Sequence, residues 1–378
     1  MFHYIKKLFS HQKNSTYLDN FFFEENSIPK AGVENYKNNV IVNRCVNIIA
    51  QSVSHVSWVV SIRGHKGIKR DDNHPIFRLL KKPNPLKAGA EFFNDLIANK
   101  LLFGNAYILM VGNENAQKEL YCLNPNSIEI VIEKNQLIGY QLQQAKPKFY
   151  PIEKISNQSR ILHLKNYNPT SDLHGLSCLE SASAVIDLHN KATKWNHSLL
   201  KNGACPSGAL VVSGGNYLTQ EQFARLKQEL YDKYSGSSNA GKPLLLEGGL
   251  DWKEMSISPK DMDFIESKNS AAREIALAFG IPPQLLGING DNTYSNMQEA
   301  RLALWEETLI PLLDKLSDTL TNWFSYWFNE NIQVDFDRDS ISVLTDRRQK
   351  LWKTLNEIQF MDINEKRAMV GLGPMKNN

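Results

Sequence analysis

The chain has 378 residues, of which 42% are hydrophobic and 22% are charged, a composition typical of folded proteins rather than disordered or collagen-like ones. With 43 Lys and Arg residues against 40 Asp and Glu residues, the net charge of +3 is too balanced for a protein that grips nucleic acid over its whole surface. The four cysteines form no CxxC pair and no apolar run approaches the roughly 18–20 residues of a membrane span, which argues against a disulfide scaffold and a membrane protein.

The first part of the chain is predicted to be α+β. Residues 1–34 are expected to form a loosely ordered basic arm. Helical periodicity then gives way to a β-type run over 40–60, and a short helix near residue 76 is stopped by Pro83. A helix that ends near Gly104 leads into the strand AYILMV, and short strands separated by turn residues continue to about residue 165.

Two helices with a small module between them are predicted next. A capping box of Ser177 and Glu180 is expected to begin a helix over 182–202, and a second box of Thr219 and Gln222 lies inside the module. This module reads as strand, helix, strand and strand over residues 204–258. The second long helix is predicted over 261–279, with acidic residues in its first turns.

A polar loop, GINGDNTYSN (287–296), is expected to precede a long helix that runs to about residue 328. Its apolar residues step by three or four, and they are Leu302, Trp305, Leu309, Leu313, Leu316, Leu320, Trp323 and Trp327. Pro311 is expected to kink the helix. Such a stripe is either buried within its own subunit or forms a coiled coil. A strand at 332–337 and two short helices near 345–358 and 363–371 complete the chain.

The sequence offers little catalytic chemistry. Residues 236–242 satisfy the pattern G-x-x-x-x-G-K of a phosphate-binding loop, but Pro243 replaces the Ser or Thr that would hold magnesium. A predicted helix precedes that loop and a predicted strand follows it, the reverse of the order such a site needs. The nine histidines show no metal-ligand spacing, and His189 and His197 are interpreted as surface or interface residues. We therefore expect no enzymatic activity, no cofactor and no metal.

An ordered series of short motifs is more informative than any single one. The motifs are HPIFRLLKKPNP, EFFNDLIANKLLFGNAYILMV, DLHGLSCLESA, FGIPPQLLG, NTYSNMQEAR, VDFD and INEKRAMVGLGP. Together they strongly resemble the portal proteins of tailed bacteriophages, which also occur in prophages and gene transfer agents. The resemblance covers about residues 35–375 and implies a dodecameric ring at one capsid vertex.

The resemblance also implies a subunit organisation and a set of partners. The expected parts are an arm (1–34), a wing (35–180), a first stem helix (181–203), a clip (204–259), a second stem helix (260–280), a tunnel-loop region (281–296), a tunnel or wing helix with a strand (297–339) and a short helical crown (340–378). The expected partners are other copies of the chain, double-stranded DNA bound without sequence specificity, the terminase large subunit, the major capsid protein and a head–tail connector, with no membrane. The expected location is the virion, and the bacterial host cytoplasm during assembly.

Charge suits this interpretation, because residues 261–339 hold 5 basic and 14 acidic side chains. Each phosphate contact of a Lys or Arg stabilises DNA binding, so an acidic bore would let DNA slide. The tunnel-loop candidates for the channel are Asn289, Asp291, Asn292, Thr293, Tyr294, Ser295 and Asn296, and the stem candidates are Lys260, Asp263, Glu266 and Lys268. Two alternatives stay open: a nucleotide-hydrolysing packaging enzyme built on the loop at 236–242, and a coiled-coil scaffold or adaptor built on the apolar stripe.

Overall fold

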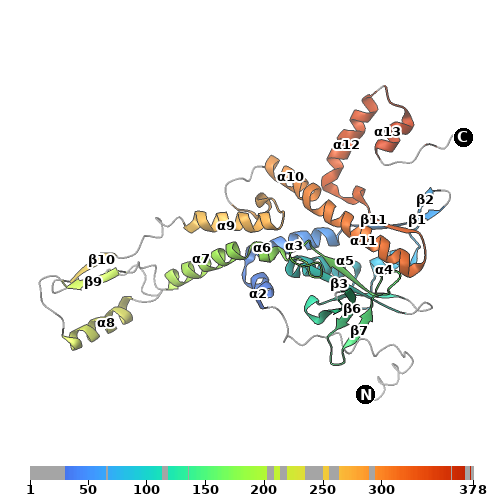
Figure 1. The fold of residues 1–378 in the computed structure, drawn as a ribbon. Helices are drawn as coiled ribbons and strands as arrows, with labels where there is room; N and C mark the ends of the chain where they lie inside the picture. The colour runs from blue at the N-terminus through green and yellow to red at the C-terminus, as the bar shows by residue number, and fades with distance from the viewer. Residues whose placement is uncertain are drawn as a thin grey trace, which may run out of the picture.

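The computed structural model describes residues 30–64, 67–112, 118–134, 136–201, 208–212, 219–234, 250–254, 264–288, 294–358, 360–370 and 375. Helices combine with small antiparallel sheets, so the α+β prediction is confirmed. Figure 1 shows a body of helices and sheets from which two helices, α7 (Ser183–Lys201) and α9 (Phe264–Ala278), extend side by side. The predicted arm (residues 1–34) lies mostly outside the described residues. Helix α2 (Lys30–Asn38) begins four residues before the predicted end of the arm.

Helix α3 (Val40–Ser54) lies in the core of the body. Its side chains Val42, Val46, Ile49 and Val53 recur every three or four residues and are almost completely buried. They belong to one apolar cluster with residues of α5 (Gly89–Phe103), α9 and the C-terminal helices. The N-terminal and C-terminal parts of the chain therefore share a single core.

Three antiparallel sheets of three strands cover this core and its neighbourhood. The first, in the order β11–β1–β2, joins distant parts of the chain, since Val60 pairs with Val334. The other two have the orders β4–β3–β8 and β5–β6–β7. The bounds are β1 (Trp58–Gly64), β2 (Gly67–Arg70), β3 (Asn105–Val111), β4 (Glu119–Leu123), β5 (Ile128–Glu133), β6 (Gln136–Leu142), β7 (Lys148–Pro151), β8 (Ile161–Lys165) and β11 (Ile332–Phe336).

The outer edge of β11 is closed by hydroxyl groups of helix α11 (Ile310–Phe328). The Ser317 and Thr321 hydroxyls both donate to the Val334 carbonyl oxygen, and the Val334 amide donates to Thr321 Oγ1 at 2.9 Å. An exposed strand edge presents unpaired backbone groups that invite pairing with other chains. Here the hydroxyl groups of α11 bind to that edge and so attach α11 to the sheet.

Helix α5 ends at Gly104, as the sequence predicts. Gly104 adopts the left-handed conformation, with φ of 71°, which side chains rarely tolerate. A Cβ on Gly104 would also overlap the backbone of Gly175, so both glycines are needed for this close approach. The turn sends β3 back across the helix that precedes it.

The predicted long helix over 182–202 corresponds to α7, but its capping box belongs to a separate short helix. Ser177 and Glu180 form the expected box at the start of α6 (Cys178–Ser181). Ala182, with φ of −94° and ψ of 3°, then interrupts the helical conformation before α7 begins. The box at Thr219 and Gln222 is present as predicted, with the Gln222 amide donating to Thr219 Oγ1 at 3.3 Å.

The predicted long helix after the polar loop is a rod of three segments: α10 (Tyr294–Ala303), a π-helical turn η6 (Leu304–Leu309) and α11. The buried residues of this part of the rod are Ala300, Leu304 and Leu309. Of the predicted stripe residues, Trp305 is half-buried and packs against the same core, whereas half-buried Leu302 does not belong to that core. The wide π turn absorbs a step of five residues and keeps Leu304 and Leu309 on the same face. Pro311 follows in the first turn of α11, so the irregularity expected at the proline takes the form of this turn.

The apolar stripe of α11 is buried within its own subunit. Leu313, Leu316, Leu320 and Trp323 are at most 3% exposed, and the Trp323 indole donates to the Ser159 carbonyl oxygen at 2.9 Å. Little of this stripe is left for a partner helix. The coiled-coil alternative thereby loses the surface on which it depends.

The remaining described elements are shorter. Beyond the far ends of α7 and α9, β9 and β10 form an antiparallel pair beside α8 (Figure 1). The loop at 236–242 lies outside the described residues. The other bounds are α4 (Pro75–Lys81), η3 (Pro125–Ser127), β9 (Gly208–Val212), α8 (Gln220–Tyr234), β10 (Leu250–Glu254), η5 (Pro283–Leu286), η7 (Arg338–Ser340), α12 (Ser342–Glu357) and α13 (Ile363–Met369).

The rod is expected to hold the body together through its buried leucines. We predict that Leu320→Ala lowers the free energy of unfolding by about 2–5 kcal/mol, because it leaves a cavity against the sheet. Urea denaturation followed by tryptophan fluorescence measures the change. Leu351→Ala on α12 is the control, since that side chain is 41% exposed and its loss should cost much less. Equal costs for the two variants would contradict the buried position of Leu320.

Candidate functional site: the helix pair and the loop before α10

The helix pair α7 and α9 is held together by small and branched apolar residues. Ile186 and Ala192 of α7 are buried, as are Ala271, Ala272 and Ile275 of α9. Alanine at the contact lets two helices approach closely. The pair is therefore packed along its inner face, while its exposed faces carry polar side chains together with the apolar Leu188, Ile265 and Leu277.

The side-chain amide of Asn39 links helix α7 to the body through hydrogen bonds. Its Oδ1 accepts hydrogen bonds from the Ile41 and Val42 amides and so caps α3. Its Nδ2 consequently points away from α3, where it donates to Asn190 Oδ1 at 2.9 Å and lies 3.2 Å from His189 Nδ1. The cap of one buried helix thus fixes the position of α7.

This contact also determines the state of His189. Because Asn39 Nδ2 is a donor, His189 Nδ1 must accept, and the imidazole is neutral. Burial, with a smaller contribution from the charge of Lys268, lowers the pKa of His189. The prediction of a surface or interface histidine is wrong here, because His189 is only 7% exposed and its contacts are within the chain.

The outer face of α9 carries two exposed carboxylates, and half-buried Arg273, seven residues after Glu266, lies on the same side. Glu266 and Glu274 are exposed and lie on the same side of the helix as Ser270, whose hydroxyl donates to Glu274 Oε1 at 3.4 Å. Sequence reasoning found Glu266 but missed Glu274, although its spacing of eight residues from Glu266 could have indicated a shared face. Lys268 is half-buried and its charge acts on His189, so it does not share this face.

The predicted tunnel loop is only partly described. Asn289, Asp291, Asn292 and Thr293 lie outside the described residues, as do the stem candidates Lys260 and Asp263. Tyr294, Ser295 and Asn296 belong to the first turn of α10, so the prediction that they are loop residues is wrong. The helix formers from Met297 to Ala300 extend the helix backwards, and Ser and Asn are well tolerated in a first turn.

The described residues offer no metal centre, since no group of three or more His, Cys, Asp and Glu side chains comes together within them. None of the described helices is long and apolar enough to cross a membrane. What this region presents is an extended surface along two packed helices, with exposed carboxylates at Glu266 and Glu274.

Comparison with known proteins assigns the family. A family model described as phage portal protein matches residues 40–371, which is most of the chain. The portal protein of Escherichia phage T5 is 25% identical over 351 residues, covering 89% of this chain and 80% of that protein. An uncharacterized protein of Rickettsia felis is 59% identical over 374 residues, covering 97% of this chain and 96% of its relative.

The fold agrees with a solved assembly. A chain in the neck of a native gene transfer agent (GTA) particle, computed with C12 symmetry, matches with a TM-score of 0.68 and 35% identity. The match covers 92% of this chain and 95% of the other.

The subunit described above is therefore of the portal type, a structural rather than a catalytic class. The chain belongs to the phage portal protein family, and its function is that of a portal protein.

The anchoring of α7 predicts an effect of pH. The unfolded imidazole takes up a proton near its ordinary pKa of about 6.5, whereas folded His189 resists protonation until lower pH. The stability it contributes is thus complete above about pH 6.5 and is lost as the pH falls, by at most about 1.4 kcal/mol per pH unit. We expect His189→Gln to make the melting temperature less sensitive to pH between 7 and 5.

Half-buried His163 on β8 has the same effect, because burial lowers its pKa to about 3, so the variant should remove only part of the pH dependence. The matched control is His55→Gln, since exposed His55 bonds only to its own helix and to the adjacent Ser54. The same pH dependence in wild type and His189→Gln would show that His189 does not link protonation to folding.

Proposed function

We propose that twelve copies of the chain form a closed ring at one capsid vertex, through whose axis double-stranded DNA is packaged and ejected. The observation that carries this proposal is the fold match over 92% of the chain to a GTA neck component computed with C12 symmetry. A match at 35% identity over nearly the whole length supports a similar symmetric assembly of this chain. A heterologous contact repeated around a closed axis generates such a ring.

The charge of the helix pair supports the conduit. In the ring, α7 and α9 would be the stem, with the acidic face of Glu266 and Glu274 directed to the axis. Carboxylates repel phosphates and so reduce the counterion release that holds a basic protein on DNA. Twelve copies of this face would give a lining on which the duplex is confined without being bound.

The other parts receive roles by position. The unit of β9, β10 and α8 would be the clip, which docks the terminase large subunit and later the head–tail connector. The loop before α10 would reach into the tunnel, the body would be the wing, and α12 with α13 would be the crown. The major capsid protein would contact the outside of the ring, and assembly would take place in the bacterial host cytoplasm.

Electron microscopy of the purified protein in negative stain tests the ring. End-on class averages should show rings with a central hole and roughly twelvefold symmetry. Compact monomers with magnesium-dependent ATPase activity that Lys242→Ala abolishes would overturn the proposal and favour the nucleotide-hydrolysing alternative.

The acidic face predicts a specific packaging defect. The double substitution E266K/E274K should slow DNA packaging, because the lysines would bind passing phosphates. The defect should be strongest at low salt and fade as salt rises, since salt weakens phosphate contacts. Packaging in vitro, measured as DNA protected from nuclease over time, gives the rate.

A matched control has the same charge change elsewhere. E129K/E133K places two lysines on strand β5, where both glutamates are exposed on the wing. This variant should package at the wild-type rate. If both double variants slow packaging equally, the effect comes from overall charge and the face of α9 has no special role in the channel.

A further inference from the structure

A groove runs along helix α3 between the rod and the base of α12. Two adjoining hollows of about 330 Å³ and 400 Å³ form it, and Gln51, Ser52 and Trp305 line both. At the end next to α10 its wall contains Arg44 and Arg301, whose side chains are exposed. The groove therefore combines an aromatic wall with two positive charges.

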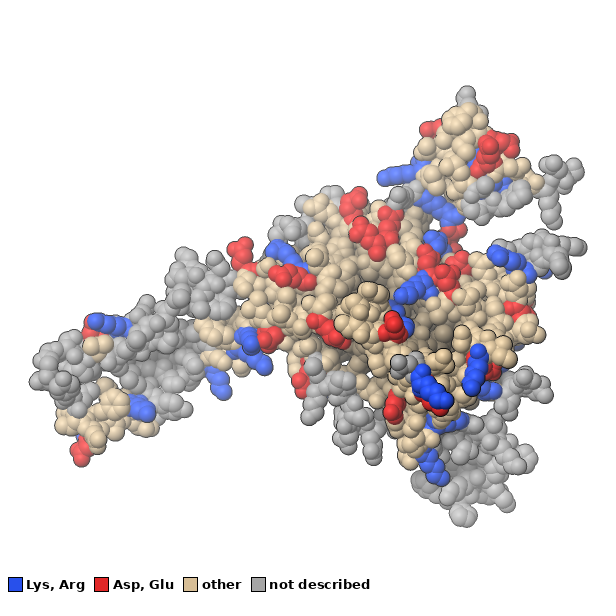
Figure 2. All heavy atoms as spheres, in the orientation of Figure 1, with Lys and Arg blue, Asp and Glu red and all other residues tan. Residues whose placement is uncertain are grey.

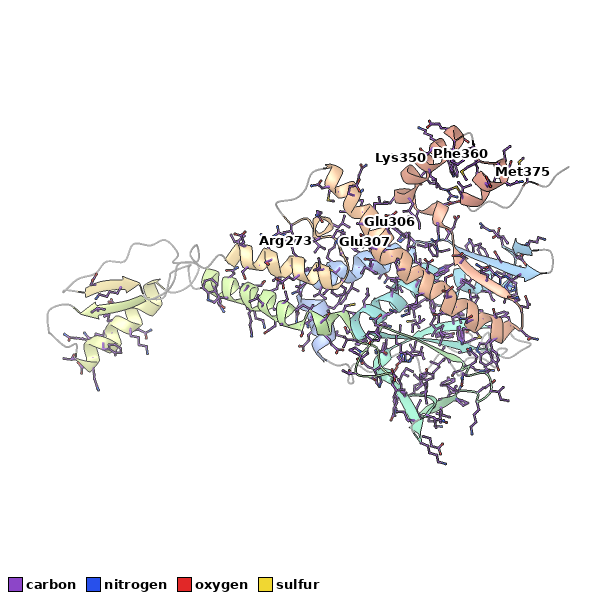
Figure 3. The ribbon with its side chains drawn as sticks, turned by 45° about the horizontal axis from the view of Figure 1, so that its top comes forward. Arg273, Glu306, Glu307, Lys350, Phe360 and Met375 are labelled. Carbon is purple, nitrogen blue, oxygen red and sulfur yellow. The ribbon has the colours of Figure 1, made fainter. Side chains whose placement is uncertain are left out.

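The opposite side of the same rod is acidic. An α-helix turns by about 100° per residue, so Glu299 and Arg301, two residues apart, point in nearly opposite directions. Because the π turn takes up one extra residue, Glu307, eight residues after Glu299, shares its side, and Glu306 lies next to Glu307. Figure 2 shows acidic side chains gathered over the rod, and Figure 3 shows Glu306 and Glu307 together on it.

We infer that these two sides of the rod are the two halves of one contact between neighbouring copies. The acidic ridge of one copy, Glu299, Glu306 and Glu307, would enter the groove of the next, where Arg44 and Arg301 meet its carboxylates. The inference rests on the proposed ring. It names the surfaces that would join one subunit to the next.

The argument for a second copy comes from charge and symmetry. A heterologous contact requires two different, complementary surfaces on each subunit, placed so that both can be occupied at once. Groove and ridge meet this condition, since they are opposite in charge and lie on opposite sides of one helix. DNA would match the arginines but would be repelled by the ridge, so a nucleic acid explains only half of the arrangement.

Charge reversal tests the contact. Full-length R44E/R301E should raise the protein concentration for half-maximal ring assembly at least about tenfold, because carboxylates would then face the ridge of the neighbour. E299R/E307R should do the same from the other side. The variant with all four changes reverses both partners and should restore assembly to near the wild-type value. Mass photometry over a dilution series measures the fraction in rings.

The control is R225E on α8, an exposed arginine far from the rod, which should assemble like wild type. Circular dichroism and melting curves confirm that each variant folds. If R44E/R301E forms rings as well as wild type does, the proposed contact is wrong. It is also wrong if the variant with all four changes does not regain ring assembly. Either result would leave the proposed ring itself standing. Absence of rings from wild type would instead count against the proposed function itself.

Discussion

The single feature on which the rest of the arrangement depends is the π turn in the rod. A regular helix from residue 294 to 328 could not keep both Ala300 and Leu313 on the core, because its apolar residues contain a step of five between Leu304 and Leu309. The π turn accommodates that step. It also brings the Thr308 hydroxyl within 2.6 Å of the Gly280 carbonyl oxygen, which joins the rod to the end of α9.

That hydrogen bond joins the rod to the helix pair at Gly280. Gly280 has φ of 67° and a Cβ there would collide with Thr308, so the chain reverses direction only with a glycine at this point. At the other side of the pair, the Asn39 amide holds α7 against the cap of α3. The helix pair is thus joined to the rest of the chain by hydrogen bonds at two points, in addition to the apolar packing of α9 in the shared core.

The elements that the sequence predicted well are those with local signals. The capping boxes, the glycine after α5 and the alternating strand residues act within a few positions and do not depend on distant contacts. The length of the rod agrees with the prediction, but the choice of residues that face the core does not. Spacings of three and four residues fit Leu302 and Trp305 as well as Ala300 and Leu304. Only packing against the core, which supplies the five-residue step, decides between them.

The candidate site was less predictable for the same reason. His189 looks like a surface residue in the sequence, and its burial follows from a contact with Asn39, 150 residues earlier. Lys268 and Glu266 are two residues apart and are both channel candidates from the sequence, yet helical geometry separates them by roughly 200°. Glu274 could be placed on the same side of α9 as Glu266 from its spacing of eight residues. That this side is the exposed one becomes clear only from the structure.

The proposed ring places two electrostatic demands on one subunit, and the fold separates them. An acidic lining lets DNA pass, but twelve acidic faces around an axis also repel one another and oppose closure of the ring. Attraction between neighbours must therefore come from surfaces away from the axis, as the arginine groove and acidic ridge of the rod would supply. Salt screens both effects, weakening the repulsion in the bore and the attraction between neighbours together. The balance between them, rather than either charge alone, would determine whether the ring closes around the duplex.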